Sequence, residues 1–471
     1  MLFHTWIFLL FFLIFYPVYL LCKNTRFKEL WLLVASYTFY GWWNPLFLLL
    51  IVWSTTVDFA MVSFMDRFGR IKLWLSLSIL NNLILLGFFK YSGFVAANIN
   101  HLLTACSIPY TLAEPNVLLP VGISFYVFQS MGYAIDFYRG RIEREKSWVR
   151  YAAFVSLFPQ LVAGPIERAG HLLPQLRKRL KISSQDISEG LSLFIVGLFK
   201  KVALADYFAL YVDKVYEMPD QYQAPALILA TVAFGWQIYF DFSGYTDMAR
   251  GVARMMGIRL MLNFNNPYMA TGLGDFWRRW HISLTSWMRD FLFLPMSYAF
   301  SKRIKSDRFM WMRTDTFVYA AGLSLSWLLV GLWHGAGWTF VIWGGLHALG
   351  RIATRKLENR KSYKHNIPQF VKQLWVFAFV SFTWIFFRAE SFNDALLILS
   401  RIFTAGWNNP QFPLFMLFLI IFAWTYQYVY ESQLRIVLQS APIRIGLVVG
   451  MMLYLVLFAS ASNQPFIYFQ F

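Results

Sequence analysis

The chain has 471 residues, of which 58% are hydrophobic, 20% aromatic and 14% charged. A soluble domain carries about 25% charged residues, and the buried fraction of a fold rises only slowly with its length, so this composition excludes a soluble enzyme. It also excludes a disordered chain, and the two cysteines, Cys22 and Cys106, are too few for a disulfide scaffold. The composition is typical of a helical protein that crosses a membrane several times.

The net charge of +18 comes from 42 Lys and Arg against 24 Asp and Glu. A strong positive charge can indicate nucleic-acid binding, but in a membrane protein basic residues gather in cytoplasmic loops. The clusters at 139–150 and 351–365 fit the second explanation, because a single inside–outside assignment puts nearly every basic cluster on one side. We therefore expect no nucleic-acid partner, and we expect the N-terminus and the C-terminus to lie outside the cytoplasm.

Apolar runs that predict membrane spans follow one another along the whole chain. In order, they are residues 5–22, 29–63 (a hairpin broken at 41–45), 73–89, 116–138, 188–211, 224–242, 316–333, 338–350, 370–387, 412–430 and 443–461. Because a span needs about 20 residues, we expect an all-α polytopic protein with about 10–12 transmembrane helices.

Two further apolar stretches do not fit simple spans. Residues 151–166 are short and have basic residues on both sides, and the overlapping sequence FPQLVAGPIER (158–168) contains two prolines and a glycine. We predict a re-entrant or interfacial segment here, with Gln160 and Glu167 facing a water-filled funnel. Residues 274–300 mix Trp, Arg and His into an apolar run, which favours a position at the inner interface.

Common catalytic motifs of soluble enzymes are missing from the sequence. It contains no GxxxxGK[ST] phosphate loop, no GxSxG nucleophile elbow and no HExxH zinc motif. We therefore expect no metal site. We expect the chemistry to come from ionisable residues inside the membrane, which are costly there and mark functional sites.

His334 lies in the sequence GLWHGAGW (331–338), at the end of an apolar run. Glycines on both sides allow a slender ligand to approach closely, and Trp333 and Trp338 supply flat walls. An imidazole in such a passage has a pKa near the working pH and can act as a general base on a hydroxyl. The residues alone favour this role and a packing role equally.

His281 lies in the sequence DFWRRWHISLTSWMRDF, three residues after Arg278 and two after Arg279. Arginine forks match phosphate geometry, so these residues can form an inner vestibule for a phosphate-bearing donor. The alternative is that the arginines extend to the lipid headgroups. For His347 we expect a structural role. The remaining histidines are expected on solvated surfaces: His4, His101, His171 and His365.

The sequence DFSGYTDMARG brings several polar groups to one end of a predicted helix. Asp241 lies between aromatic residues and needs a partner. Ser243 and Tyr245 follow it closely. Asp247 and Arg250 are three residues apart and can pair on one helical face.

Taken together, these segments resemble the membrane-bound O-acyltransferase (MBOAT) family, and most closely its bacterial alginate O-acetyltransferase branch. The pair of sequences WRRWHISL and LWHGAGW is the most specific part of this resemblance. The matching stretches are PVGISFYVFQSMGYAIDFYRG (120–140), FPQLVAGPIER (158–168), YFDFSGYTDMARG (239–251), FWRRWHISLTSWMRDFLFLP (276–295), GLWHGAGWTFVIWGGLHALG (331–350) and WIFFRAESF (384–392).

The resemblance implies a single membrane domain over residues 1–471, with core motifs at about 115–350 and peripheral helices at 1–91 and 370–461. Its helices would form a ring around a central tunnel. His334 matches the catalytic histidine of the family, and His281 matches its supporting histidine. The residues expected to line the tunnel or bind the donor are Arg278, Arg279, Trp280, Trp333, Gly335, Trp338, Asp241, Ser243 and Tyr245.

The resemblance also implies an activity. We expect transfer of an acyl group, acetyl above all, from a cytoplasmic thioester to a hydroxyl of an extracytoplasmic polysaccharide such as alginate or cellulose. Acetyl-CoA or a carrier-protein thioester would be the donor substrate, with no bound cofactor. The partners would be the acceptor polymer or a secreted SGNH-type acetyltransferase, and the location the bacterial inner membrane. The alternative function is a polysaccharide exporter, or a scaffold for secreted acetylating enzymes.

Overall fold

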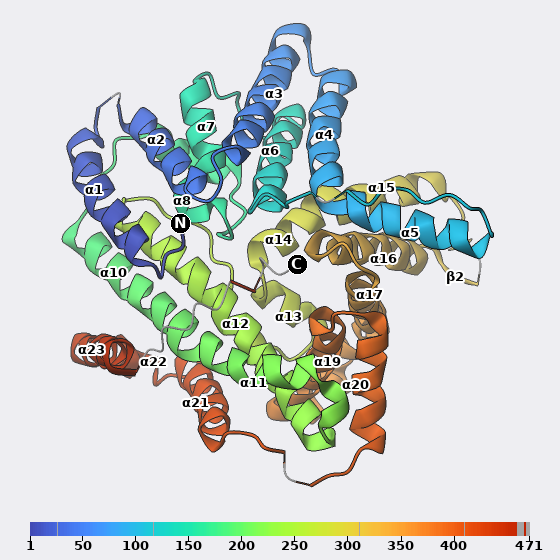
Figure 1. Cartoon of the computed structure of the whole chain (residues 1–471). Helices are drawn as coiled ribbons and strands as arrows, with labels where there is room; N and C mark the ends of the chain where they lie inside the picture. The colour runs from blue at the N-terminus through green and yellow to red at the C-terminus, as the bar shows by residue number, and fades with distance from the viewer. Residues whose placement is uncertain (26, 116, 310, 409, 459–465, 468–471) are drawn as a thin grey trace. The chain divides into compact units, whose positions relative to one another are not determined.

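The computed structural model describes residues 1–25, 27–115, 117–309, 311–408, 410–458 and 466–467 (Figure 1). Helices make up nearly all of its regular structure, and the strands β1 (Arg308–Phe309) and β2 (Met312–Arg313) form one short antiparallel hairpin. The predicted all-α fold class is thereby confirmed. The end of the predicted span at 443–461 and the predicted exterior position of the C-terminal residue fall outside the described residues.

The described chain divides into two compact units. The first unit comprises Met1–Phe194 and Tyr245–Met261, and the second comprises Ile195–Gly244 and Leu262–Phe471. The helices α10 (Ser184–Phe199) and α12 (Ala224–Met255) contribute residues to both.

The first unit holds the helices of the N-terminal part of the chain. In order, they are α1 (Trp6–Cys22), α2 (Lys28–Gly41), α3 (Phe47–Phe68), α4 (Lys72–Leu86), the π-helical turn η1 (Gly87–Tyr91), α5 (Ser92–Ala105), α6 (Ile123–Tyr138), α7 (Trp148–Ser156), α8 (Phe158–Leu161) and α9 (Ala169–Arg177). Within this unit α3, α4 and α6 pack against one another (Figure 1).

The predicted re-entrant stretch in the first unit is a broken helical segment. It consists of α7 and the single turn α8, which meet at Leu157 in an extended conformation. Pro159 lies in the first turn of α8, where its missing N–H leaves no hydrogen bond unmade. Every residue of this stretch from 151 to 166 is buried, which agrees with the rule that irregular backbone at membrane depth must be covered.

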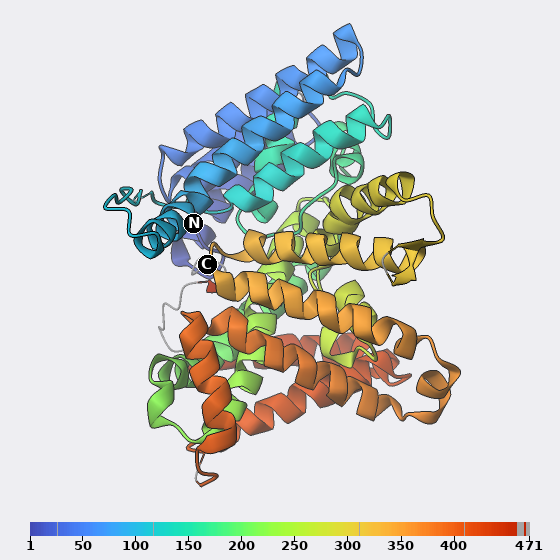
Figure 2. The same ribbon diagram turned by 90° about the vertical axis from the view of Figure 1, so that its right-hand side faces the viewer.

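The second unit holds the C-terminal helices and their connecting turns. They are η2 (Lys200–Ala205), α11 (Asp206–Glu217), η3 (Pro219–Gln221), η4 (Pro267–Met269), α13 (Leu273–Arg279), α14 (Ile282–Met288), η5 (Arg289–Phe293), α15 (Leu294–Arg303), α16 (Thr314–His334), α17 (Trp338–Glu358), α18 (Lys361–Asn366), α19 (Gln369–Arg388), α20 (Phe392–Thr404), α21 (Leu414–Glu431), α22 (Arg435–Gln439) and α23 (Ala441–Phe458). Figure 2 shows α16 and α17 side by side.

Six helices in the described part of the chain are long and apolar enough to cross a membrane, and two shorter apolar helices, Trp6–Cys22 and Ala441–Leu457, accompany them. The six are Phe47–Phe68, Lys72–Ala105, Ala224–Met255, Thr314–His334, Gln369–Arg388 and Leu414–Glu431. The sequence-based count of about 10–12 is larger because it includes segments such as α10 and α17, which are shorter or carry more charge.

Glycines join α16 and α17 into a tight hairpin. A Cβ atom on Gly331 would lie 2.2 Å from the carbonyl oxygen of Phe340, and one on Gly344 would lie 2.2 Å from that of Trp327. Only glycine allows such a close approach of two backbones. This packing fixes His334, the last residue of α16, at the tip of the hairpin.

Candidate active site

His334 is buried at the end of α16, with 5% of its surface exposed. The helix ends because Gly335 takes an extended conformation, and its N–H still donates to the carbonyl of Gly331. A Cβ on Gly335 would lie 2.1 Å from the ring of Phe340. The glycine after the histidine therefore lets an aromatic ring close over the end of the helix.

Aromatic rings from three helices enclose the His334 imidazole. Its centroid lies 4.9 Å from that of Trp333, 5.1 Å from that of Trp343 on α17, and 5.3 Å from that of Phe387 on α19. All three pairs meet edge to face, the arrangement that aromatic quadrupoles favour. Such walls hold the imidazole in one orientation and keep bulk water from it.

His281 begins α14 in the left-handed region, with φ of 42°. This conformation is uncommon for a non-glycine residue and clusters at functional sites. Asn263 stabilises the turn, since its carbonyl accepts from Ile282 N at 2.9 Å and its side chain accepts from Ser283 Oγ at 2.9 Å. Burial lowers the pKa of His281 to about 3, so its imidazole is neutral at physiological pH.

The ring of Trp333 lies close to both histidines. Its ring centroid lies 6.0 Å from that of His281 and 4.9 Å from that of His334. The ring of Phe242 on α12 also packs on His281, with 4.7 Å between the ring centroids. The second unit thus brings together the two histidines that the sequence singled out, with an indole ring between them.

His347, for which the sequence predicted a structural role, contacts protein groups on neighbouring helices. It is buried among three tryptophan rings, and its Nε2 lies 3.0 Å from the hydroxyl of Thr383. Because that hydroxyl donates to the carbonyl of Val380 at 2.7 Å, its oxygen accepts from the imidazole N–H. This bond ties α17 to α19 close to His334.

Asp241 has the partner that its position demands. Lys201 Nζ lies 3.0 Å from Asp241 Oδ1 and 2.9 Å from Asp206 Oδ1, and all three side chains are at most 5% exposed. The backbone N–H of Ile467 donates to Asp241 Oδ2 at 2.8 Å. A buried carboxylate paired in this way fixes the stretch of α12 whose next residue, Phe242, supports His281.

Comparison with known proteins decides the family. The sequence model that describes the membrane-bound O-acyltransferase family matches residues 138–393 of this chain. The probable alginate O-acetylase AlgI of Azotobacter vinelandii is 38% identical over 415 residues, which cover 86% of this chain and 79% of that protein. The chain belongs to the membrane-bound O-acyltransferase family. The matched region contains both histidines and Asp241.

Other relatives agree with this assignment. The peptidoglycan O-acetyltransferase of Helicobacter pylori is 34% identical over 80% of this chain and 74% of its own. The teichoic acid D-alanyltransferase of Bacillus subtilis is 28% identical over 55% of this chain and 67% of its own. The protein is therefore an O-acyltransferase and a multi-pass membrane protein.

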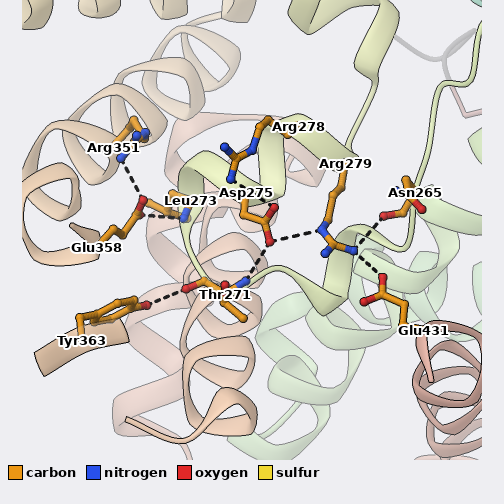
Figure 3. Close-up of polar contacts among 10 residues, drawn as sticks. All are labelled: Asn265, Thr271, Leu273, Asp275, Arg278, Arg279, Arg351, Glu358, Tyr363 and Glu431. Atoms are coloured by element: carbon orange, nitrogen blue, oxygen red, sulfur yellow. Dashed lines mark hydrogen bonds and ion pairs between the residues drawn. The ribbon is translucent and has the colours of Figure 1, made fainter. Parts of the chain in front are cut away.

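Within this O-acyltransferase, the guanidinium of Arg279 forms ion pairs with two carboxylates (Figure 3). Its guanidinium lies 3.2 Å from Asp275 Oδ2 and also bonds Glu431 at the end of α21. Its backbone carbonyl accepts from Asn265 N at 2.9 Å. These contacts give Arg279 the role of joining α13 to α21.

Arg278, by contrast, is 77% exposed at its side chain, and its guanidinium lies 3.4 Å from the carboxylate of Asp275. It therefore offers charge to the solvent. Beside these residues, Arg351 and Glu358 of α17 anchor the start of α13, because Glu358 accepts from Leu273 N at 2.9 Å (Figure 3).

The other predicted site residues differ in their surroundings. Trp280 is buried against Trp384 at 5.3 Å, and Ser243 is buried on α12, whereas Trp338 is 58% exposed at the start of α17. Tyr245 belongs to the first unit, where its ring packs on that of Phe3 at 5.0 Å.

The first unit also shows where the remaining predicted polar residues lie. The predicted pair of Asp247 and Arg250 is confirmed at 3.2 Å. Gln160 and Glu167 are 2% exposed, and each is hydrogen-bonded by protein groups, Gln160 to the carbonyl of Phe154 and Glu167 to His171.

Sequence reasoning missed Lys201 and Asp206. A signal was present, because Lys200 and Lys201 interrupt the apolar run 188–211, and an ionisable residue within such a run marks a buried pair. The carboxylates that occupy Arg279 were missed as well, since Glu431 is distant in sequence.

Proposed function

We propose that this O-acyltransferase moves an acetyl group from a cytoplasmic thioester, acetyl-CoA, to hydroxyls of an extracytoplasmic polysaccharide. The observation that carries the proposal is the buried, aromatic-enclosed His334 at the tip of the α16–α17 hairpin. Relatives named as alginate O-acetylases and as a peptidoglycan O-acetyltransferase support acetyl as the group and a sugar polymer as the acceptor class. The close aromatic walls favour a small acyl group over a long one.

In the proposed reaction, the acceptor oxygen attacks the carbonyl carbon of the thioester, and the C–S bond breaks. His334 takes the proton of the acceptor hydroxyl and returns it to the departing thiolate. His281 stays neutral and, through Trp333, helps to hold His334 in place. Much of the barrier reduction comes from holding donor and acceptor end to end.

The exposed guanidinium of Arg278 would meet the phosphates of the donor at the cytoplasmic face. The acceptor is either the polymer itself or a secreted SGNH-type acetyltransferase that passes the acetyl group on. We place the protein in the bacterial inner membrane with both termini outside, and protease access to terminal tags in spheroplasts checks this orientation.

The test uses the purified protein, labelled acetyl-CoA and alginate or cellulose oligosaccharides, with mass analysis of the products. His334→Ala should lower acetyl transfer about 10²–10⁴-fold, whereas His365→Ala, at an exposed position on α18, should leave it unchanged. Normal transfer by His334→Ala would overturn the proposal. An exporter or a scaffold would consume no thioester at all. Turnover of a carrier-protein thioester alone would overturn the assignment of the donor.

A further inference from the structure

His281 stands at the position that caps a helix, but its side chain does not cap α14. The first N–H groups of a helix have no acceptor within the helix, and an oxygen of a Ser, Thr, Asp or Asn side chain at this position usually accepts from one of them. The imidazole of His281 packs instead on the rings of Phe242 and Trp333. The first turn of α14 therefore needs acceptors from another part of the chain.

Asn263 supplies those acceptors from a separate segment of the second unit. Its backbone carbonyl accepts from Ile282 N at 2.9 Å. Its side-chain oxygen Oδ1 accepts from Ser283 N at 3.2 Å and from Ser283 Oγ at 2.9 Å. Asn263 and Ser283 both have an exposed fraction of 0%, so these bonds form away from bulk water. One asparagine thus does what the residue at the cap position does not do.

The same segment also holds the chain just before His281. Asn265 N donates to the carbonyl of Arg279 at 2.9 Å, so residues 263–265 bond to the backbone on both sides of the histidine. A non-glycine residue with a φ of 42° persists only where its surroundings determine the conformation. Without the bonds to Asn263, His281 would be free to join α14 in the right-handed conformation, which would turn its imidazole away from Trp333.

The hydrogen bonds also fix which way round the amide of Asn263 lies. Ser283 N can only donate, so the atom that faces it is the oxygen of the amide. The nitrogen, Nδ2, is buried and has no hydrogen-bond partner in the described part of the chain. The side chain therefore acts through Oδ1, and a carboxyl group at this position would keep the accepting oxygen.

We propose that Asn263 is a positioning residue for acyl transfer, which holds His281 in the conformation that sets its imidazole against Trp333. The inference rests on the proposed function, in which His281 and Trp333 help to hold His334. Asn263 acts through His281 and not through a substrate. Its loss should therefore lower kcat and leave KM for acetyl-CoA unchanged.

Steady-state acetyl transfer from acetyl-CoA to alginate oligosaccharides measures both parameters. A misplacement of about 1 Å can cost about 10²-fold in rate, so Asn263→Ala should lower kcat by up to about 10²-fold. Asn263→Asp keeps the accepting oxygen and should retain much more of the rate. Asn265→Ala is the matched control, because Asn265 is exposed and bonds Arg279 through its backbone N–H, which alanine keeps. A rise in KM at constant kcat for Asn263→Ala would overturn the proposal.

A double-mutant cycle separates positioning of His281 from a general structural role. His281→Asn removes the imidazole but tolerates the left-handed backbone. If Asn263 acts only through His281, adding Asn263→Ala to His281→Asn should not lower kcat further. Losses that multiply in the double variant would overturn the proposal, since Asn263 would then act by another route.

Hydrogen exchange reads the turn in the purified protein without any substrate. Asn263→Ala should speed exchange in the peptide that contains Ile282 and Ser283, whereas Asn265→Ala should not. If Asn263→Ala does not fold, Ser283→Ala replaces it in all three measurements, because it removes one of the two bonds to Oδ1. Unchanged exchange would overturn the proposal. A wild type that transfers no acetyl group would overturn the proposed function instead, and the exchange would still show whether Asn263 holds the turn.

Discussion

Two neighbouring regions of the second unit handle polar side chains in opposite ways. In the histidine region, defined by Phe242, His281, Trp333 and His334, aromatic rings cover the imidazoles. In the arginine region, defined by Asp275, Arg278, Arg279 and Glu431, carboxylates face guanidinium groups. Along the chain, only Trp280 separates Arg279 of the arginine region from His281 of the histidine region.

The difference shows how one short sequence serves two purposes. The arginine region is partly exposed, so its charges keep their hydration and hold α13 in place through ion pairs. The histidine region is buried, and burial keeps the His281 imidazole neutral at physiological pH. The following changes separate these two behaviours, beginning with the largest expected effect on stability.

Lys201→Met should remove the charge that pairs with Asp241, the residue next to Phe242 of the histidine region. It leaves Asp206 and Asp241 buried without their cation, and breaking a buried pair costs about 3–5 kcal/mol of unfolding free energy. Denaturant unfolding in mixed micelles measures the loss. Lys200→Met is the matched control, because it removes the same charge from the adjacent, partly exposed residue, whose ammonium lies 5.8 Å from the centre of the Tyr239 ring. Equal losses in the two variants would contradict the structural role of Lys201.

Arg279→Ala should weaken the arginine region. Asp275 and Glu431 would lose their shared partner, and we expect a loss of about 1–3 kcal/mol in unfolding free energy because the network is only partly buried. Rescue by a second change, Glu431→Gln, would show that the ion pair carries the effect. A variant as stable as the wild type but unable to bind donor would place Arg279 in the donor site instead.

His281 should make stability depend on pH, unlike the arginine region. Its folded pKa of about 3 lies below the ordinary value of 6.5, so the unfolded chain binds the proton more readily and stability falls as the pH falls through about 6.5. Between about pH 7.5 and pH 5.5 the loss should be about 1.4 kcal/mol. His281→Asn, which tolerates the left-handed backbone, should remove this part of the pH dependence. Unfolding curves with an unchanged slope against pH would show that His281 is not the group responsible.

Arg278→Ala should have the smallest effect on stability, below about 0.5 kcal/mol, because the side chain is exposed. We expect KM for acetyl-CoA to rise a few-fold at low salt, with kcat unchanged, and the difference from wild type to shrink at high salt. Steady-state kinetics at two ionic strengths measures both parameters. A fall in kcat at constant KM would contradict a role in donor binding.

Hydropathy predicted most spans but not where each helix ends. α16 and α19 begin and end within two residues of the predicted runs. α12, by contrast, continues past 242 to Met255, because Arg250 and Arg254 form ion pairs with acidic residues instead of entering water. Residues 92–105, between the predicted spans 73–89 and 116–138, form the helix α5.

The candidate site was predictable where one motif carried all the information. The two histidines and Trp333 come from such motifs, and the fold brings them together. The partners of Asp241 and Arg279 were not predictable, because Lys201 and Glu431 lie far away in sequence and only the packing of helices brings them near. The spacing of apolar residues shows which face of a helix is buried, but it does not show which helix packs against that face.

The α16–α17 hairpin has a mechanical consequence. With backbone against backbone at Gly331 and Gly344, the two helices cannot slide past each other, since packed interiors transmit strain and do not absorb it. Any displacement of α17 therefore carries His334 with it. The imidazole of His334 therefore keeps a fixed position relative to both helices, beside the exposed Trp338 at the start of α17.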